Sequence, residues 1–165
     1  HKKGAREYYD RLVQLVSELG LREAVTFIGS VPSQQIPSTY QTHDILISCT
    51  HMQTWGIAAF EAMATGQLVI LSRTTGASEV LTDRENVLIA EPLSPTSIRD
   101  SVKELFTDVS LCQKLSEQGA RFVREKITWD KYAEAMLELF KQPRKKEHHK
   151  KEVGEIAARR KIYYK

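Results

Sequence analysis

Three short apolar runs, each joined to the next by a segment with helical periodicity, constrain the fold more than any other feature. The runs are Ile45–Ser48, Leu68–Ser72 and residues 87–90. Strands that read as continuous apolar runs, rather than alternating with polar residues, are typical of parallel sheets that helices cover on both faces. The sequence therefore predicts an α/β fold with a doubly wound parallel sheet.

The segments on either side of these runs complete the predicted organisation. Before them, we expect an amphipathic helix over residues 5–19 that Gly20 ends, a strand over residues 25–29 and a short helix over residues 35–42. After residue 93 the pattern predicts helices only, at about 96–107, 110–126 and 129–141. The prediction is one domain over residues 1–140, followed by an extension over residues 141–165.

The stretch from Gln53 to Gly66 reads Gln-Thr-Trp-Gly-Ile-Ala-Ala-Phe-Glu-Ala-Met-Ala-Thr-Gly. It places Gly56 where a loop turns into a helix, and Glu61 one and a half turns further along. The first N–H groups of a helix have no partner within the helix, and the helix dipole favours negative charge there. The stretch therefore predicts a site for phosphate or sugar oxygens.

This stretch resembles the donor-sugar motif of the retaining GT-B glycosyltransferases, the group that includes glycogen synthase. The family pattern is an acid, any residue, Phe or Trp, Gly, four residues, and then Glu-Ala-Met-Ala with a Gly two positions later. Other motifs of the family's nucleotide-binding C-terminal domain follow in the same order, and the similarity runs from about Leu12 to Phe140. The resemblance implies a Rossmann-like domain that lacks its first two strands and the N-terminal domain that binds the acceptor.

The missing strands predict a gap in the sheet. By analogy with the family they would lie between the strand at residues 25–29 and the strand Ile45–Ser48, so that four remaining strands would not form a continuous sheet. An interior gap leaves ladder N–H and C=O groups unpaired, at about 1–3 kcal/mol for each buried group. The favoured interpretation is that this chain is a fragment that other polypeptide completes. The alternative is that its sheet is rearranged.

The resemblance also assigns roles to residues of the Glu61 motif. It implies that Glu61 accepts hydrogen bonds from the ribose hydroxyls of a nucleotide sugar. Backbone N–H groups of Gly56, Ile57 and Ala58 would bind the sugar and the β-phosphate, with glycine allowing a close approach. Trp55 would be either a platform for the donor or acceptor, or a packing residue beside the helix start.

Two further positions belong to the predicted donor site. Gly76 and Ala77 follow the strand Leu68–Ser72 and repeat the strand-loop-helix geometry, so they form a second candidate for phosphate binding, with a simple tight turn as the alternative. Backbone contacts near Val31 would select the base. The resemblance implies no metal ion, because helix N-termini and an Arg/Lys pair outside this chain would stabilise the diphosphate.

Gln53 is the one departure from the motif, since the family has an acid at this position. An amide can hydrogen-bond a sugar hydroxyl. It cannot carry negative charge beside an oxocarbenium-like transition state or act as a base. Gln53 is therefore the candidate catalytic position whose chemistry the sequence leaves open.

Charge is distributed unevenly along the chain. The net charge is +3, but residues 141–165 contain ten Lys or Arg against three Glu, which leaves the preceding 140 residues mildly acidic. A nucleic-acid enzyme would carry its basic patch on the folded body, so that class is disfavoured. The alternatives for 141–165 are a solvated extension and a segment that binds an anionic membrane surface.

The expected setting is cytoplasmic, since the sequence has neither an apolar run of about 18 residues nor a secretory signal. Cys49 and Cys112 lack metal-ligand spacing, and we expect two reduced thiols without a chemical role.

The combined expectation is the donor-binding part of a glycosyltransferase that moves a hexose from a UDP- or GDP-linked sugar to a glycan or a lipid-linked acceptor. Its other partner would be the missing N-terminal domain or a separate chain. The alternative is a non-catalytic glycosyltransferase-like subunit that binds or stabilises a partner chain. Gln53 and the missing strands favour this alternative.

Overall fold

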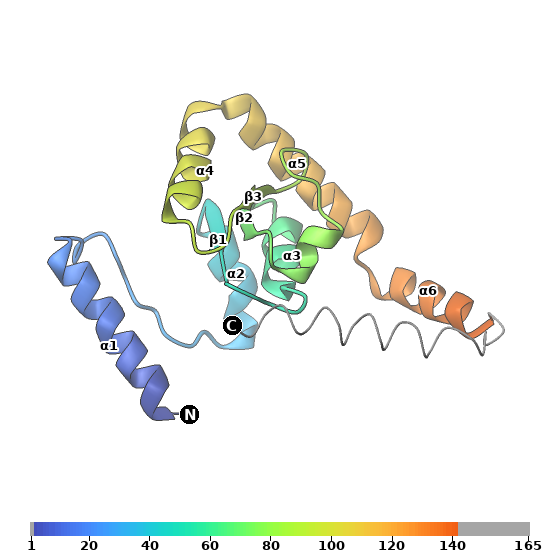
Figure 1. Cartoon of the computed structure of the whole chain (residues 1–165). Coiled ribbons are helices and arrows are strands. Elements are labelled where there is room, and N and C mark those ends of the chain that lie inside the picture. Colours follow the sequence, from blue (N-terminus) through green and yellow to red (C-terminus); the bar gives the residue numbers. More distant parts are fainter. Residues whose placement is uncertain (1, 142–165) are drawn as a thin grey trace, which may run out of the picture.

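The computed structural model describes residues 2–141, with a three-stranded parallel sheet at the centre. Of the extension predicted for 141–165, all but Lys141 lies outside the described residues. In chain order the elements are α1 (Lys2–Glu18), η1 (Ser33–Gln35), α2 (Ile36–Gln41), β1 (Ile45–Ser48), α3 (Ile57–Ala64), β2 (Leu68–Ser72), η2 (Gly76–Glu79), β3 (Leu88–Ala90), α4 (Pro95–Thr107), α5 (Val109–Lys126) and α6 (Trp129–Lys141) (Figure 1).

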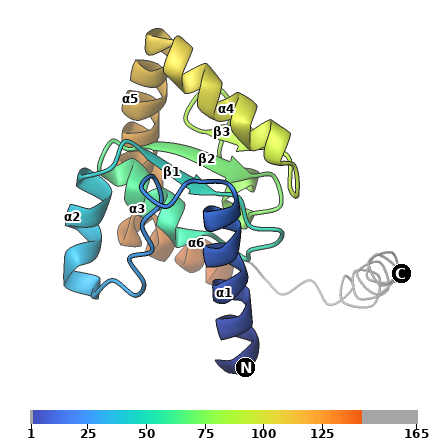
Figure 2. The same cartoon turned by 90° about the vertical axis from the view of Figure 1, so that its left-hand side faces the viewer.

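The sheet confirms the predicted α/β class. Its strand order is β1-β2-β3, and both pairs are parallel, with Ile47 opposite Ile70 and Leu71 opposite Ile89. Figure 2 shows the sheet between α4 on one side and α3 on the other. Helices therefore cover both faces, as continuous apolar strands require.

The two faces of β2 organise the core, because successive side chains of a strand point in opposite directions. Val69 and Leu71 pack with Phe60 and Met63 of α3. On the other face, Ile70 packs with apolar residues of β3, α4 and α5, namely Leu88, Ala90, Leu105, Leu111 and Leu115. The helix α5 contributes to both clusters and so ties the two layers together.

The strand predicted over residues 25–29 is not present, and this prediction is wrong. That segment has no strand pairing, and Val25, Phe27 and Ile28 are each more than a third exposed. A strand exists only where a neighbouring strand accepts and donates its backbone hydrogen bonds. The segment instead packs Phe27 against Tyr9 of α1, with ring centroids 5.2 Å apart.

The prediction of a gap inside a four-stranded sheet is also wrong. The three strands that form are contiguous, and β1 lies at one edge with Ile47 47% exposed. Trp129, at the start of α6, is a large aromatic residue of a kind expected in a core, but no element of the described structure covers it. Trp129 is 86% exposed, and α6 buries none of its residues there.

Candidate functional site

Two loops meet at the carboxyl edge of the sheet, where β1 and β2 both end. Parallel strands place the loops that follow them side by side, and ligands of open α/β sheets bind at this edge. The loop after β1 is joined to the loop after β2 by two backbone hydrogen bonds. The Gly76 N–H donates to the Gln53 carbonyl at 3.0 Å, and the Ala77 N–H donates to the Trp55 carbonyl at 2.9 Å.

Gly56 begins α3 in the left-handed conformation, with φ 81° and ψ 50°. Residues other than glycine rarely adopt this region, so the turn from loop to helix depends on glycine at this position. The N–H groups of Ile57 and Ala58, in the first turn, have no hydrogen-bond acceptor among the residues described. The structure thus contains the helix start with free donors that the sequence predicts.

Glu61 lies on the exposed surface of α3, one and a half turns after Gly56. Its Oε2 accepts a hydrogen bond of 3.2 Å from the Tyr40 hydroxyl of α2. Burial, followed by the nearby Glu61 charge and this hydrogen bond, raises the pKa of Tyr40. Among the described residues Glu61 forms no salt bridge, so its carboxylate retains capacity to accept further hydrogen bonds.

Gln53 lies beside Gly56 in the loop after β1. Its Oε1 would be 3.6 Å from a Cβ added to Gly56, and it accepts a long hydrogen bond of 3.5 Å from Thr50 Oγ1. The side chain is half-buried. The predicted catalytic position and the predicted phosphate-binding turn are therefore neighbours in the fold.

The role of Trp55 is in part that of a packing residue. Its ring lies 5.4 Å from the ring of Phe60, which is four positions into α3, and this is the arrangement of a hydrophobic staple. Trp55 nevertheless remains 40% exposed. The ring contact with Phe60 fixes the entry to α3, and the role of Trp55 as a platform for the donor or acceptor stays a prediction.

Gly76 and Ala77 use their N–H groups within the protein, as described above, and Ala77 is fully buried. Both residues therefore hold the two loops together, and their assignment to phosphate binding stays a prediction. Val31 is half-buried in the connection between α1 and η1. Its assignment to base selection also stays a prediction.

Two residues that contact groups of the candidate site escaped the sequence reasoning. Tyr40 contacts Glu61 across 21 positions of sequence, and no spacing rule relates residues so far apart. The side chain of Thr75 makes no cap hydrogen bond to the short helix that follows it, and the residue is 1% exposed. Its position directly before Gly76 was the only signal available.

Cys49 and His43, both in the described part of the chain, have surroundings that account for them without a chemical role. Burial raises the pKa of the Cys49 thiol, which favours the protonated and unreactive form. The Nδ1 atom of His43 lies 2.7 Å from the Thr39 carbonyl of the preceding helix. The described residues contain no group of three or more His, Cys, Asp or Glu that could hold a metal ion.

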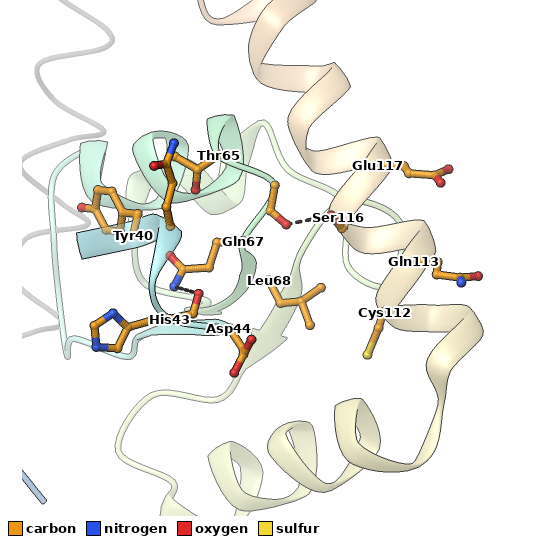
Figure 3. A pocket seen from close by; sticks show the side chains of 12 residues that line it. Tyr40, His43, Asp44, Thr65, Gln67, Leu68, Cys112, Gln113, Ser116 and Glu117 are labelled. Atoms are coloured by element: carbon orange, nitrogen blue, oxygen red, sulfur yellow. Dashed lines mark hydrogen bonds between the residues drawn. The ribbon is translucent and has the colours of Figure 1, made fainter. Parts of the chain in front are cut away.

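A separate cavity of about 470 Å³ lies at the opposite edge of the sheet, where β1 and β2 begin (Figure 3). Its lining includes Asp44, Gln67 and, from α5, Ser116. The Gln67 Nε2 donates to the His43 carbonyl at 2.9 Å, and Ser116 Oγ donates to the Gly66 carbonyl at 2.7 Å. The first bond joins the segments that precede β1 and β2, and the second joins the end of α3 to α5. Because this cavity lies at the opposite edge of the sheet from Gly56, it is not the predicted donor site.

None of the helices in the part of the chain that the structure describes is long and apolar enough to cross a bilayer.

Comparison with known proteins identifies the family. The profile of the family "Glycosyl transferases group 1" matches residues 3–122. An uncharacterized glycosyltransferase from Methanocaldococcus jannaschii is 28% identical over 138 residues, which is 84% of this chain and 35% of that protein. The chain thus spans about a third of the length of the curated relatives that it matches.

Solved structures show the same fold. The C-terminal domain of the group 1 glycosyl transferase LpcC from Francisella tularensis is 32% identical, with a TM-score of 0.69 over 74% of this chain and 64% of that one. HepE of Anabaena, solved with UDP and glucose, has a TM-score of 0.76 at 19% identity, over 83% of this chain and 37% of that one. The chain belongs to the group 1 glycosyltransferase family and forms part of a GT-B C-terminal-like domain.

Proposed function

We propose that residues 1–140 are the donor-binding part of a retaining glycosyltransferase that transfers a hexose from a UDP- or GDP-linked sugar to a glycan or a lipid-linked acceptor. The observation that carries this proposal is the junction at Gly56, where α3 begins. The N–H groups of Ile57 and Ala58 are unpartnered there, among the residues described, and the same helix carries the Glu61 carboxylate. HepE, which has this fold, is solved with UDP and glucose. Its ligands support a nucleotide sugar as the donor.

The chemistry of the edge fits this role. Departure of a nucleoside diphosphate concentrates negative charge on its β-phosphate, and free N–H groups at a helix start stabilise that charge without a metal ion. Glu61 would accept hydrogen bonds from the two ribose hydroxyls and so fix the nucleoside relative to α3. Gln53 would bind a hydroxyl of the hexose through its amide.

A non-catalytic subunit is the second candidate, and two observations favour it. Gln53 cannot supply the charge that the family's acid supplies, and β1 leaves one edge of the sheet open to another polypeptide. In either case we propose that other polypeptide, from the same protein or a partner, completes the domain. We also propose that the basic residues of 141–165 bind anionic lipid headgroups from the cytoplasmic side.

The test of donor binding is calorimetry on the whole protein that carries these residues. Charge-assisted hydrogen bonds contribute about 1.5–3 kcal/mol, so Glu61→Ala should weaken the binding of UDP or GDP by roughly 10- to 150-fold. Glu125→Ala, on the exposed surface of α5, is the matched control and should bind as the parent does. Equal affinity of the Glu61 variant and the parent would remove Glu61 from the site.

A further inference from the structure

Thr75 lies between the two loops of the candidate site. It is 1% exposed, although it belongs to a loop at the edge of the sheet. Its Cγ2 methyl would lie only 2.6 Å from a Cβ added to Gly56. The methyl group therefore fills the space that a side chain at the start of α3 would occupy.

The backbone on both sides of Thr75 is fixed by the neighbouring loop. Gln53 and Thr75 form an isolated parallel bridge, and the next residue, Gly76, donates to the Gln53 carbonyl at 3.0 Å. A Cβ on Gly76 would lie 1.8 Å from the Thr54 carbonyl oxygen, so the two backbones touch there. Thr75 is consequently held in place and can in turn hold Gly56.

Gly56 needs such a restraint. A glycine adopts many backbone conformations at little cost, so its left-handed conformation is not fixed by its own side chain. The direction of the first N–H groups of α3 depends on that conformation. We propose that Thr75 is a positioning residue, whose methyl group holds Gly56 and thereby aims the N–H groups of Ile57 and Ala58 at the donor diphosphate.

This inference rests on the proposed function. It assigns the positioning role to the methyl group of Thr75 and none to its hydroxyl group. The Oγ1 atom is buried without a hydrogen-bond partner among the described residues. Thr75→Val keeps one methyl group at the Cγ2 position and replaces the hydroxyl with a second methyl group of similar size. Thr75→Ser keeps the hydroxyl and removes the methyl, so the two variants distinguish packing from hydrogen bonding.

The first experiment measures the contact itself by thermal unfolding of Gly56→Ala, Thr75→Ser and the double variant. Gly56→Ala alone should lower the melting temperature strongly, because alanine is strained in this left-handed conformation and its Cβ would also meet the Thr75 methyl. Removal of that methyl makes room for the new Cβ. Gly56→Ala should therefore lower the melting temperature clearly less in the Thr75→Ser background than in the parent. Strictly additive shifts would overturn the proposed contact.

The second experiment measures donor affinity with UDP-glucose and GDP-mannose on the whole protein, well below all melting temperatures. Thr75→Val should bind as the parent does, whereas Thr75→Ser should bind about 10-fold more weakly, since misdirected N–H groups lose part of their charge-assisted hydrogen bonds to the diphosphate. Val123→Ala, which removes buried apolar volume on α5, controls for loss of stability and should keep the parent's affinity.

The outcomes separate this inference from the function on which it rests. If the parent binds one of the sugars and Thr75→Ser binds it equally well, the positioning role is wrong while donor binding stands. If Thr75→Val loses affinity as Thr75→Ser does, the methyl group is not the feature that matters and the inference fails. If the parent binds neither nucleotide sugar, the proposed function fails and the positioning role fails with it.

Discussion

The Tyr40 hydroxyl donates a hydrogen bond to Glu61 Oε2 at 3.2 Å and thereby joins α2 to α3. Tyr40 also packs against the core cluster that contains Phe60 and Met63. The carboxylate proposed to bind ribose is thus oriented by a tyrosine that is itself anchored in the core. A hydrogen bond of this kind restricts the rotamers of Glu61 and leaves its second oxygen available.

The first prediction concerns alkaline pH. Because the pKa of Tyr40 is raised in the folded protein, the folded state holds this proton more tightly than the unfolded state does. The resulting stability is fully present below the ordinary tyrosine pKa of about 10 and is lost as pH rises through the higher folded value. Tyr40→Phe should abolish this component. Absorbance titration should show one late-titrating tyrosine in the parent, and its persistence in Tyr40→Phe would contradict the assignment.

The second prediction concerns Gln53. Gln53→Glu restores the acid of the family motif with little change in size. If the protein is inactive only because Gln53 replaces the acid, the substitution should measurably raise sugar transfer or donor hydrolysis by the whole protein. The new charge near the diphosphate should also weaken donor binding through repulsion, so calorimetry and turnover are measured together. Robust transfer by the unmodified whole protein would eliminate the non-catalytic reading.

The third prediction concerns the contact between the loops at Gly76. Gly76→Ala would place a Cβ 1.8 Å from the Thr54 carbonyl oxygen, and backbone atoms cannot yield as a flexible side chain can. We expect a loss of at least about 3 kcal/mol of unfolding free energy, at the severe end for point substitutions. Gly4→Ala, in α1 with open space around it, is the matched control. Chemical denaturation that gives similar midpoints for both variants would contradict the structure of this contact.

The fourth prediction concerns the open edge of the sheet. The edge of β1 presents unpaired backbone groups beside Ile47, so residues 1–165 studied alone should be marginally stable or should associate through this edge. Ile47→Lys places a charge there and should reduce association in analytical ultracentrifugation. A monodisperse parent with a melting temperature above about 65 °C would count against an incomplete sheet.

Local pattern was sufficient for most of the secondary structure. The apolar runs predicted β1 and β2 with the bounds that the structure shows, and helical periodicity with the breaks at Ser94 and residues 127–128 predicted α4, α5 and α6 closely. The motif at Gly56 likewise predicted a helix start with free donors, because left-handed glycine and unpaired first-turn N–H groups are local properties of the backbone.

Pairing and burial could not be predicted in this way. Residues 25–29 have the composition of a strand, but a strand needs a neighbouring strand to pair with. No strand of the described chain pairs with them. Trp129 has the character of a core residue, yet no element of the described structure covers it. Both predictions failed for the same reason. Strand pairing and burial depend on which two segments meet in the fold, and the sequence of one segment does not specify its partner.

The sequence by itself determined the α/β class, the order of the elements from β1 to α6 and the Gly56 and Glu61 motif, since these depend on periodicity and on the conformational limits of single residues. The tertiary structure decided that Tyr40 reaches Glu61 and that Thr75 fills the space beside Gly56. It also decided that the Gly76 and Ala77 N–H groups join the two loops. The contacts of Thr75, Gly76 and Ala77 arise because parallel strands bring the loops that follow them to one edge of the sheet. Tyr40 reaches Glu61 because α2 packs beside α3, and in both cases only the folded backbone sets the distances.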